Sequence, residues 1–305
     1  MVDIRYIYQR GLLMPYVIKH YPNDTSYHKV FHDVVTFLSN MNEKYQFLHF
    51  HWSRFEGMFA RGDLKTEELS SISLFVDDQD QIKGLLTYED EPHLWFAIYE
   101  DHIDLKKAIF DYYFKHHKED DLIIPHDLEM MTLLNDANYE KTDWIDSIMR
   151  FSLDDFEYPH LLDFHIKSLE EDYRLDQIHH ALWKGFNHGD DIDYSIENLE
   201  SRRHMTSSPH FKKKYTFVAI KDDSYVSYAG IWYLDQTKTA LIEPVATVPE
   251  HRRKGLSKAC IYHAIKEVRK DGAKDIFVDS TQQFYKDIGF EMYHEAYRFK
   301  KVNRD

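Results

Sequence analysis

The sequence has little of what marks exported, membrane-bound or disulfide-stabilised proteins. Cys260 is the single cysteine, which excludes an internal disulfide and a cysteine-based zinc cluster. No run approaches the roughly 20 apolar residues that cross a bilayer, and the start at Met1 lacks the apolar core of a signal peptide. Only 10 glycines and 8 prolines occur in 305 residues, so we expect no long flexible linker. These absences predict a cytoplasmic protein without a membrane partner.

Positive charge is also in short supply. The chain has 38 Lys and Arg against 53 Asp and Glu, a formal net charge of −15. This balance repels nucleic acid and anionic membranes, and it weakly favours a cationic small molecule or peptide. The 43% hydrophobic content and the length suffice for two cores of roughly 150 residues each.

The second half of the sequence predicts an α+β fold with a mixed sheet. Apolar residues recur at helical spacing in some segments and alternate in others, with Asp222-Asp223 and Asp235-Gln236 as hairpin turns. Helices are expected at residues 173–186, 194–205, 250–271 and 282–287, and strands at 164–166, 215–220, 225–233, 240–248, 276–278 and 291–300.

The first half carries a weaker copy of the same plan. Leu133–Glu140 aligns with Phe284–Glu291, and strand-like stretches at 75–76, 82–88 and 94–99 repeat the order found in the second half. Chance could produce one matching octamer, but three pieces in the same order favour internal duplication. We therefore expect two lobes, residues 1–155 and 156–305, joined at 154–162 where the periodicity is interrupted.

The most informative stretch of the sequence places basic residues between a strand and a helix. His251–Lys254 and Lys258 surround Gly255 and Ser257, which are small enough for a phosphate to approach the backbone. Walker and dinucleotide-binding glycine patterns are absent. A solvated basic turn is the alternative, but cations oppose the helix dipole at this position. The pattern therefore favours an anionic ligand such as a pyrophosphate.

These residues resemble a known family. Arg252–Ser257 resembles the Arg/Gln-x-x-Gly-x-Gly/Ala motif of the GNAT superfamily of N-acetyltransferases, and Phe284–Phe290 resembles its Phe-Tyr-x-x-x-Gly-Phe segment. The resemblance covers residues 164–302 well and 4–151 as a degenerate repeat, which predicts a tandem GNAT protein. It implies a splayed mixed sheet that holds acetyl-CoA between its fourth and fifth strands.

The resemblance also implies roles for individual residues. Tyr285 would be the general acid, and Ser280 would replace the usual Asn. Glu243 is our candidate base. The alternatives are that Tyr285 is an aromatic core residue and that Glu243 is a solvated carboxylate. The pantetheine arm would pair with the backbone of Ala246, Thr247 and Val248, and the pyrophosphate with the N–H groups of Arg253, Lys254, Gly255, Leu256, Ser257 and Lys258. Candidates for the acceptor pocket are Trp183, Phe186, His188 and Asp190.

The first lobe departs from the family pattern. Glu100, Asp101 and Asp104 lie where phosphates would bind, and Leu134 replaces the tyrosine. We expect this lobe to bind no acetyl-CoA and to pack against the acceptor groove. The 20 histidines include His49 and His51, but their spacing indicates structural residues and no metal site. Cys260 lies on the apolar helix face, which favours a packed thiol.

The predicted function is acetyl-CoA-dependent N-acetyltransfer directly to an amine. Two alternatives stay open, a non-catalytic acetyl-CoA sensor and an enzyme that uses a longer acyl-CoA. The sequence does not identify the acceptor, because loops build acceptor pockets. It also leaves the oligomeric state open, with a homodimer as one option.

Overall fold

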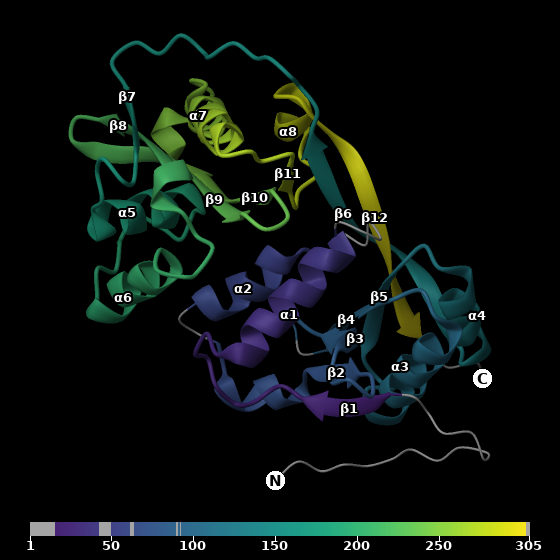
Figure 1. Cartoon of the computed structure of the whole chain (residues 1–305). Coiled ribbons are helices and arrows are strands. Elements are labelled where there is room, and N and C mark those ends of the chain that lie inside the picture. Colours follow the sequence, from purple (N-terminus) through teal and green to yellow (C-terminus); the bar gives the residue numbers. More distant parts are fainter. Residues whose placement is uncertain (1–15, 43–49, 62–63, 90, 92, 303–305) are drawn as a thin grey trace. The chain divides into compact units, whose positions relative to one another are not determined.

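The chain forms two compact units in a computed structural model that describes residues 16–42, 50–61, 64–89, 91 and 93–302 (Figure 1). Unit 1 comprises Met1–Met58, Leu64–Ser147 and His294–Asp305, and unit 2 comprises Phe59–Asp63 and Ile148–Tyr293. Both units combine helices with a mixed sheet, which confirms the expected fold class. No helix in the described part of the chain is long and apolar enough to cross a membrane.

Unit 2 contains the elements that the second half of the sequence predicts, within a few residues. Its strands follow the order β7-β8-β9-β10-β11, and only the β10–β11 pair is parallel. Positive φ angles at Asp222 and Asp223 make the tight β8–β9 turn. The elements of the second half of the chain are β7 His165–Ser168, α5 Leu175–Gly185, α6 Ile196–Met205, η4 Lys213–Tyr215, β8 Phe217–Lys221, β9 Ser224–Leu234, β10 Thr239–Thr247, η5 Pro249–His251, α7 Leu256–Lys270, β11 Asp275–Val278, α8 Gln283–Asp287 and β12 Phe290–Lys301.

Helices cover both faces of the unit 2 sheet, with α7 on one side and α5 and α6 on the other (Figure 1). Ala229, Ile231 and Tyr233 of β9 join the core beneath α7. On the opposite face α5 approaches β10 closely, because Gly185 has no side chain. A Cβ added to Gly185 would lie 2.6 Å from Cβ of Ala246 and 3.1 Å from a backbone nitrogen.

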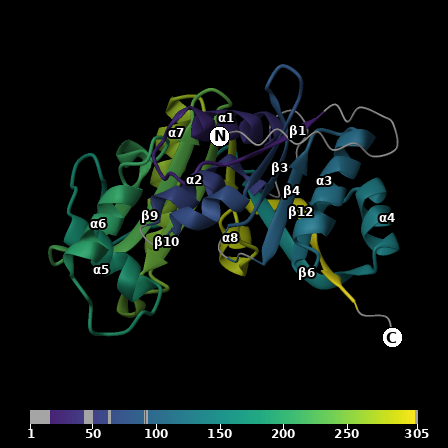
Figure 2. The same ribbon diagram turned by 90° about the horizontal axis from the view of Figure 1, so that it is seen from below.

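Unit 1 repeats this plan with strand order β1-β2-β3-β4-β5. Its β4–β5 pair is parallel and its other pairs are antiparallel. Helices α3 and α4 lie side by side (Figures 1 and 2). The elements are β1 Val17–His20, α1 Lys29–Asn40, α2 Trp52–Ala60, η3 Thr66–Ser71, β2 Ser73–Val76, β3 Ile82–Thr87, β4 Leu94–Tyr99, α3 Ile103–His116, β5 Asp121–Pro125, α4 Leu128–Asp136 and β6 Tyr139–Phe151.

The repeated octamer occupies equivalent places in the two units. Helix α4 ends at Asp136 and α8 ends at the aligned Asp287. Asn138 and Gly289, which align with each other, both have positive φ angles of 62° and 99°. Strands β6 and β12 then begin at the aligned Tyr139 and Phe290. The two halves therefore share a plan down to the register of a turn.

The final strand of each half completes the sheet of the other unit. Met149 and Arg150 of β6 pair with β11 in unit 2, whereas Ala296–Phe299 of β12 pair with β5 in unit 1. The expected boundary at 155/156 does not coincide with these units, because β6 enters unit 2 at Ile148 and the C-terminal residues belong to unit 1. Sequence periodicity locates strands but does not select their partners.

Gly185→Ala tests the close approach of α5 to β10. We expect it to lower the free energy of unfolding by about 1–3 kcal/mol, because the rigid backbone of Ala246 and Thr247 blocks the new methyl group. Gly57→Ala in α2 is the control, since a Cβ there has nothing within 4 Å. It should raise stability by about 0.5–1 kcal/mol through helix propensity. Urea unfolding measures both, and equal effects would contradict close packing at Gly185.

Cys260 gives a test of the unit 2 core. The thiol is fully buried beneath α7, and burial raises its pKa to about 12. The reactive thiolate is therefore scarce and inaccessible. We expect no labelling of the folded protein by a chromogenic disulfide reagent at about pH 8, and one equivalent after denaturation. Rapid labelling of the folded protein would show that this core opens.

Candidate functional site

The parallel strands β10 and β11 diverge in the middle of unit 2. Their ladder pairs Thr239–Leu241 with Asp275–Phe277, and β10 then continues to Thr247 through an irregularity between Ile242 and Val245. Ala246 and Thr247 still pair with β9 on one edge. On the other edge no strand pairing is observed for them among the described residues, so this edge of β10 is available for pairing with an extended ligand.

The start of α7 follows directly after this stretch of β10. Arg253 and Gly255 adopt positive φ angles of 62° and 78°, and Gly255 caps the helix without a side-chain hydrogen bond. In the described structure the N–H groups of Arg253–Lys258 have no backbone acceptor. A helix N-terminus of this kind attracts anions through its free amides and a charge of about +0.5.

Arg252 links the turn before α7 to the end of α5. Its Nε donates to the Thr247 carbonyl at 3.0 Å, and its Nη2 donates to the Gly185 carbonyl at 2.8 Å and to Asn187 Oδ1 at 2.9 Å. Sequence reasoning recognised Arg252 as the first residue of the motif but assigned it no role. The structure makes it a positioning residue that joins the end of β10 and the turn before α7 to the end of α5.

Polar side chains near the helix start are largely engaged within the protein. The Ser257 hydroxyl hydrogen-bonds to the hydroxyls of Thr247 and Ser227, and Ser227 also donates to the Ala246 carbonyl at 3.0 Å. Lys254 Nζ donates to the Glu250 carbonyl at 3.0 Å. These contacts stabilise the turn and leave the backbone amides as its free donors.

Tyr285 lies in α8 among aromatic residues, with its ring 5.1 Å from that of Phe284 and 5.7 Å from that of Phe290. Burial, together with the charge of Glu243, raises the pKa of Tyr285 to about 12. The hydroxyl therefore keeps its proton at neutral pH. Glu243 is solvent-exposed on β10.

The remaining predicted residues fall into two places. The Ser280 hydroxyl accepts the Gln282 N–H at 3.4 Å, at the start of α8. The four predicted acceptor-pocket residues lie at the end of α5 and in the following loop, and they are Trp183, Phe186, His188 and Asp190. The Trp183 and His188 rings are 5.3 Å apart, and the Phe186 and His188 rings are 6.4 Å apart. Asp190 is exposed and pairs with Lys184 at 2.6 Å, so it stands apart from the aromatic group.

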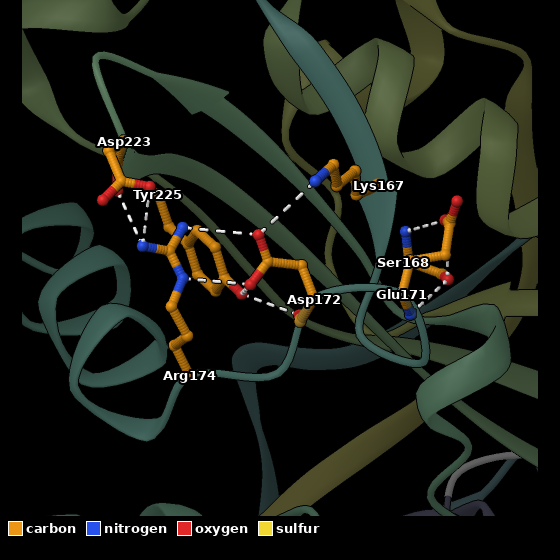
Figure 3. A network of polar contacts seen from close by, with 7 residues as sticks. All are labelled: Lys167, Ser168, Glu171, Asp172, Arg174, Asp223 and Tyr225. Carbon is orange, nitrogen blue, oxygen red and sulfur yellow. Dashed lines mark hydrogen bonds and ion pairs between the residues drawn. The ribbon is translucent and has the colours of Figure 1, made fainter.

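A polar network holds the start of α5 in place (Figure 3). Arg174 pairs at 3.0 Å with both Asp172 and Asp223, and its guanidinium lies over the Tyr225 ring. The Tyr225 hydroxyl donates to Asp172 Oδ1 at 2.9 Å. Nearby, the Ser168 hydroxyl donates to Glu171 at 2.9 Å. Since Arg252 holds the other end of α5, the helix is fixed at both ends over β9 and β10.

In unit 1, β4 also extends beyond its ladder with β5, but charged side chains occupy the start of the helix that follows. Its β4–β5 ladder ends at Phe96 and Ile123, while β4 continues to Tyr99. Beside the start of α3, Lys106 Nζ binds Asp101, Asp127 and Glu129 at 2.5, 2.9 and 2.7 Å and is nearly buried. These residues line a cavity of about 610 Å³. An internal ammonium and three carboxylates thus occupy the place that corresponds to the free helix start in unit 2.

The histidines show no metal-binding arrangement in the part of the chain that the structure describes. No group of three or more His, Cys, Asp or Glu residues there could hold a metal ion. His51 and His179 are buried in different units. His49 lies outside the described residues.

Comparisons with known proteins agree with this geometry. Residues 175–290 match the family model of the acetyltransferase (GNAT) family. No curated protein matches the chain.

Three solved structures share the fold at low sequence identity. A GCN5-related N-acetyltransferase from Sphaerobacter thermophilus is 10% identical, with a TM-score of 0.56 over 94% of this chain and 95% of that one. A tandem GNAT protein from the clavulanic acid biosynthesis pathway is 10% identical, with a TM-score of 0.55 over 94% and 100%. A GNAT acetyltransferase from Colwellia psychrerythraea is 12% identical, with a TM-score of 0.51 over 76% and 86%.

The matched segment contains both predicted motifs, the divergent strands and the free helix start. The repeated plan of unit 1 agrees with the tandem relative over nearly the whole chain. Residues 175–290 therefore form an acetyltransferase (GNAT) family domain, and the chain shares its fold with solved GNAT acetyltransferases, one of which is a tandem GNAT protein.

Proposed function

We propose that the protein transfers an acetyl group from acetyl-CoA to an amine, and that unit 2 performs the reaction. The observation that carries this proposal is the edge of β10 without a strand partner among the described residues, which leads to the free amides of α7. Ala246–Val248 would hold the pantetheine arm, and the N–H groups of Arg253–Lys258 would hold the pyrophosphate. Acetyl-CoA supplies the activated thioester.

Tyr285 and Glu243 would manage the protons of the reaction. The amine nitrogen forms a bond to the acetyl carbon, the carbon–sulfur bond breaks, and the thiolate takes a proton from Tyr285. Because the pKa of Tyr285 is raised to about 12, the hydroxyl carries that proton at every physiological pH. Glu243, directly or through water, would accept the proton that the amine loses. Attack is direct because both reactants are held together.

The acceptor would bind near the end of α5, where Trp183, Phe186 and His188 gather. Gly185 and Arg252 support this proposal, since they join that end of α5 to β10. The acidic balance of the chain supports a small-molecule or peptide amine over nucleic acid. In unit 1 the carboxylates around Lys106 would repel a pyrophosphate, which supports one active site in the chain.

Tyr285→Phe tests the general acid. CoA release, measured with a panel of amines, should fall by about 10²-fold or more, while the affinity for acetyl-CoA stays unchanged. In the wild type, the raised pKa of Tyr285 predicts no loss of rate from its deprotonation up to about pH 10. Tyr293→Phe, a tyrosine elsewhere in unit 2, is the control. Undiminished turnover of Tyr285→Phe would remove Tyr285 from this role.

The same assay separates the alternatives. Tight acetyl-CoA binding without turnover of any amine would indicate a sensor. If CoA is released faster from a longer acyl-CoA than from acetyl-CoA, the enzyme uses the longer acyl-CoA as its donor.

Gly255→Glu tests the cofactor site. It places a carboxylate beside the amides that would bind pyrophosphate, so acetyl-CoA affinity measured by calorimetry should fall by about 10²-fold or more. Gly272→Glu is the matched control, because Gly272 also has a positive φ but lies at the opposite end of α7. Retained affinity in Gly255→Glu would contradict the assignment. Since the full chain is used, residual stoichiometric binding would reveal a second site in unit 1.

A further inference from the structure

Four side chains of unit 2 form a polar cluster in which two buried donors have no hydrogen-bond partner among the described residues. This donor cluster consists of His179 and Trp183 from α5, Arg202 from α6 and Tyr228 from β9. Tyr228 is fully buried, and its hydroxyl has no partner among the described residues. The indole Nε1 of Trp183 is also buried and unpartnered there. Buried donors are normally satisfied, so the cluster requires an explanation.

Arg202 supplies positive charge to the donor cluster. No carboxylate forms an ion pair with its guanidinium in the described structure, and Nε donates to His179 Nδ1 at 3.4 Å. Arg202 contacts His179 of α5, and Tyr228 points from β9 to the sheet face that α5 covers, so both residues lie on the same side of the sheet. Burial lowers the pKa of Arg202.

His179 orients Arg202 and adds no acceptor for a ligand. Burial, followed by the charge of Arg202, lowers the pKa of His179, so the ring is neutral. Since Nδ1 accepts from Arg202, the ring proton is on Nε2. Asp193, the carboxylate whose charge acts on His179, is occupied by Ser195 and Asn198 at the start of α6.

The donor cluster adjoins the proposed reaction site. Tyr228 lies opposite Ala246 in the β9–β10 ladder, so both side chains point to the face that α5 covers. Gly185 of α5 packs directly on Ala246. The rings of His179 and Trp183 are 5.4 Å apart, and Trp183 continues to His188 of the proposed acceptor loop.

We infer that Arg202 and Tyr228 bind a carboxylate of the acceptor, which would then be an amine that also carries a carboxylate, such as an amino acid. This inference rests on the proposed function. A planar guanidinium matches a carboxylate through paired hydrogen bonds, and a single positive charge with neutral donors suits a singly charged anion. The amine end would point toward Glu243, while the carboxylate end satisfies the orphan donors.

The test compares L-amino acids with their C-terminal amides in the CoA-release assay. The wild type should prefer the amino acid in kcat/KM by about tenfold or more, mainly through KM. Arg202→Gln should remove this preference and leave the amides unaffected. Arg203→Gln is the control, because Arg203 is exposed and pairs with Glu200. Equal loss for amino acids and amides, or no preference in the wild type, would overturn the inference.

Tyr228→Phe removes one donor without removing a protein contact. Because the hydroxyl is unpartnered, the variant should unfold at an unchanged or higher temperature while losing part of the preference for the carboxylate. A large loss of stability with unchanged preference would indicate a structural role and count against the inference.

Binding experiments separate this inference from the proposed function. Amino acids and amides are titrated into the acetyl-CoA-free full chain, and binding is followed by ligand-observed NMR for the wild type and Arg202→Gln. Carboxylate-dependent binding that Arg202→Gln abolishes, without turnover of any amine, would retain the carboxylate site and reject the transferase. Turnover confined to amines without a carboxylate would retain the transferase and reject the carboxylate site.

Discussion

The divergence of β10 from β11 is the constraint on which the rest of unit 2 depends. Two parallel strands that stayed paired would satisfy each other's backbone and leave nothing for a ligand. Their ladder stops at Leu241 and Phe277, and beyond it β9 is the strand that pairs with β10 among the described residues. The strand leads directly to the left-handed Gly255 and the free amides of α7. Strand β10 thus leads from an edge without a strand partner, among the described residues, to the unpaired amides at the start of α7.

The approach of α5 converts this path into a site with two sides. Gly185 permits backbone contact with Ala246, and Arg252 binds the carbonyls of both Gly185 and Thr247. At the other end Arg174 holds the helix to the β8–β9 turn. Arg252 and Arg174 therefore hold α5 in place. The dipole and the free amides of α7 supply the affinity for an anion.

Duplication explains the similarity of the two units, and strand exchange explains why neither half of the chain corresponds to one unit. Unit 1 retains the divergent strands but fills the helix start with Lys106 and three carboxylates. Lys106 makes the carboxylates mutually compatible, because a buried ammonium offsets their repulsion. The same architecture therefore presents free backbone donors in one unit and an ion cluster with excess negative charge in the other.

The sequence by itself determined the element order of unit 2, the duplication and the turn around Gly255, because hydrophobic period, glycine geometry and helix-start chemistry are local properties. It also proposed Tyr285 as the general acid, through the resemblance, and Glu243 as the base, from its place on the strand before the helix. Only the tertiary structure decided that β6 and β12 exchange units, that Arg252 secures α5, and that Arg202 and Tyr228 lie on the same side of the sheet. Those outcomes depend on which distant segments pack together, and strand partners or helix faces far apart in the chain leave no signal in residue spacing.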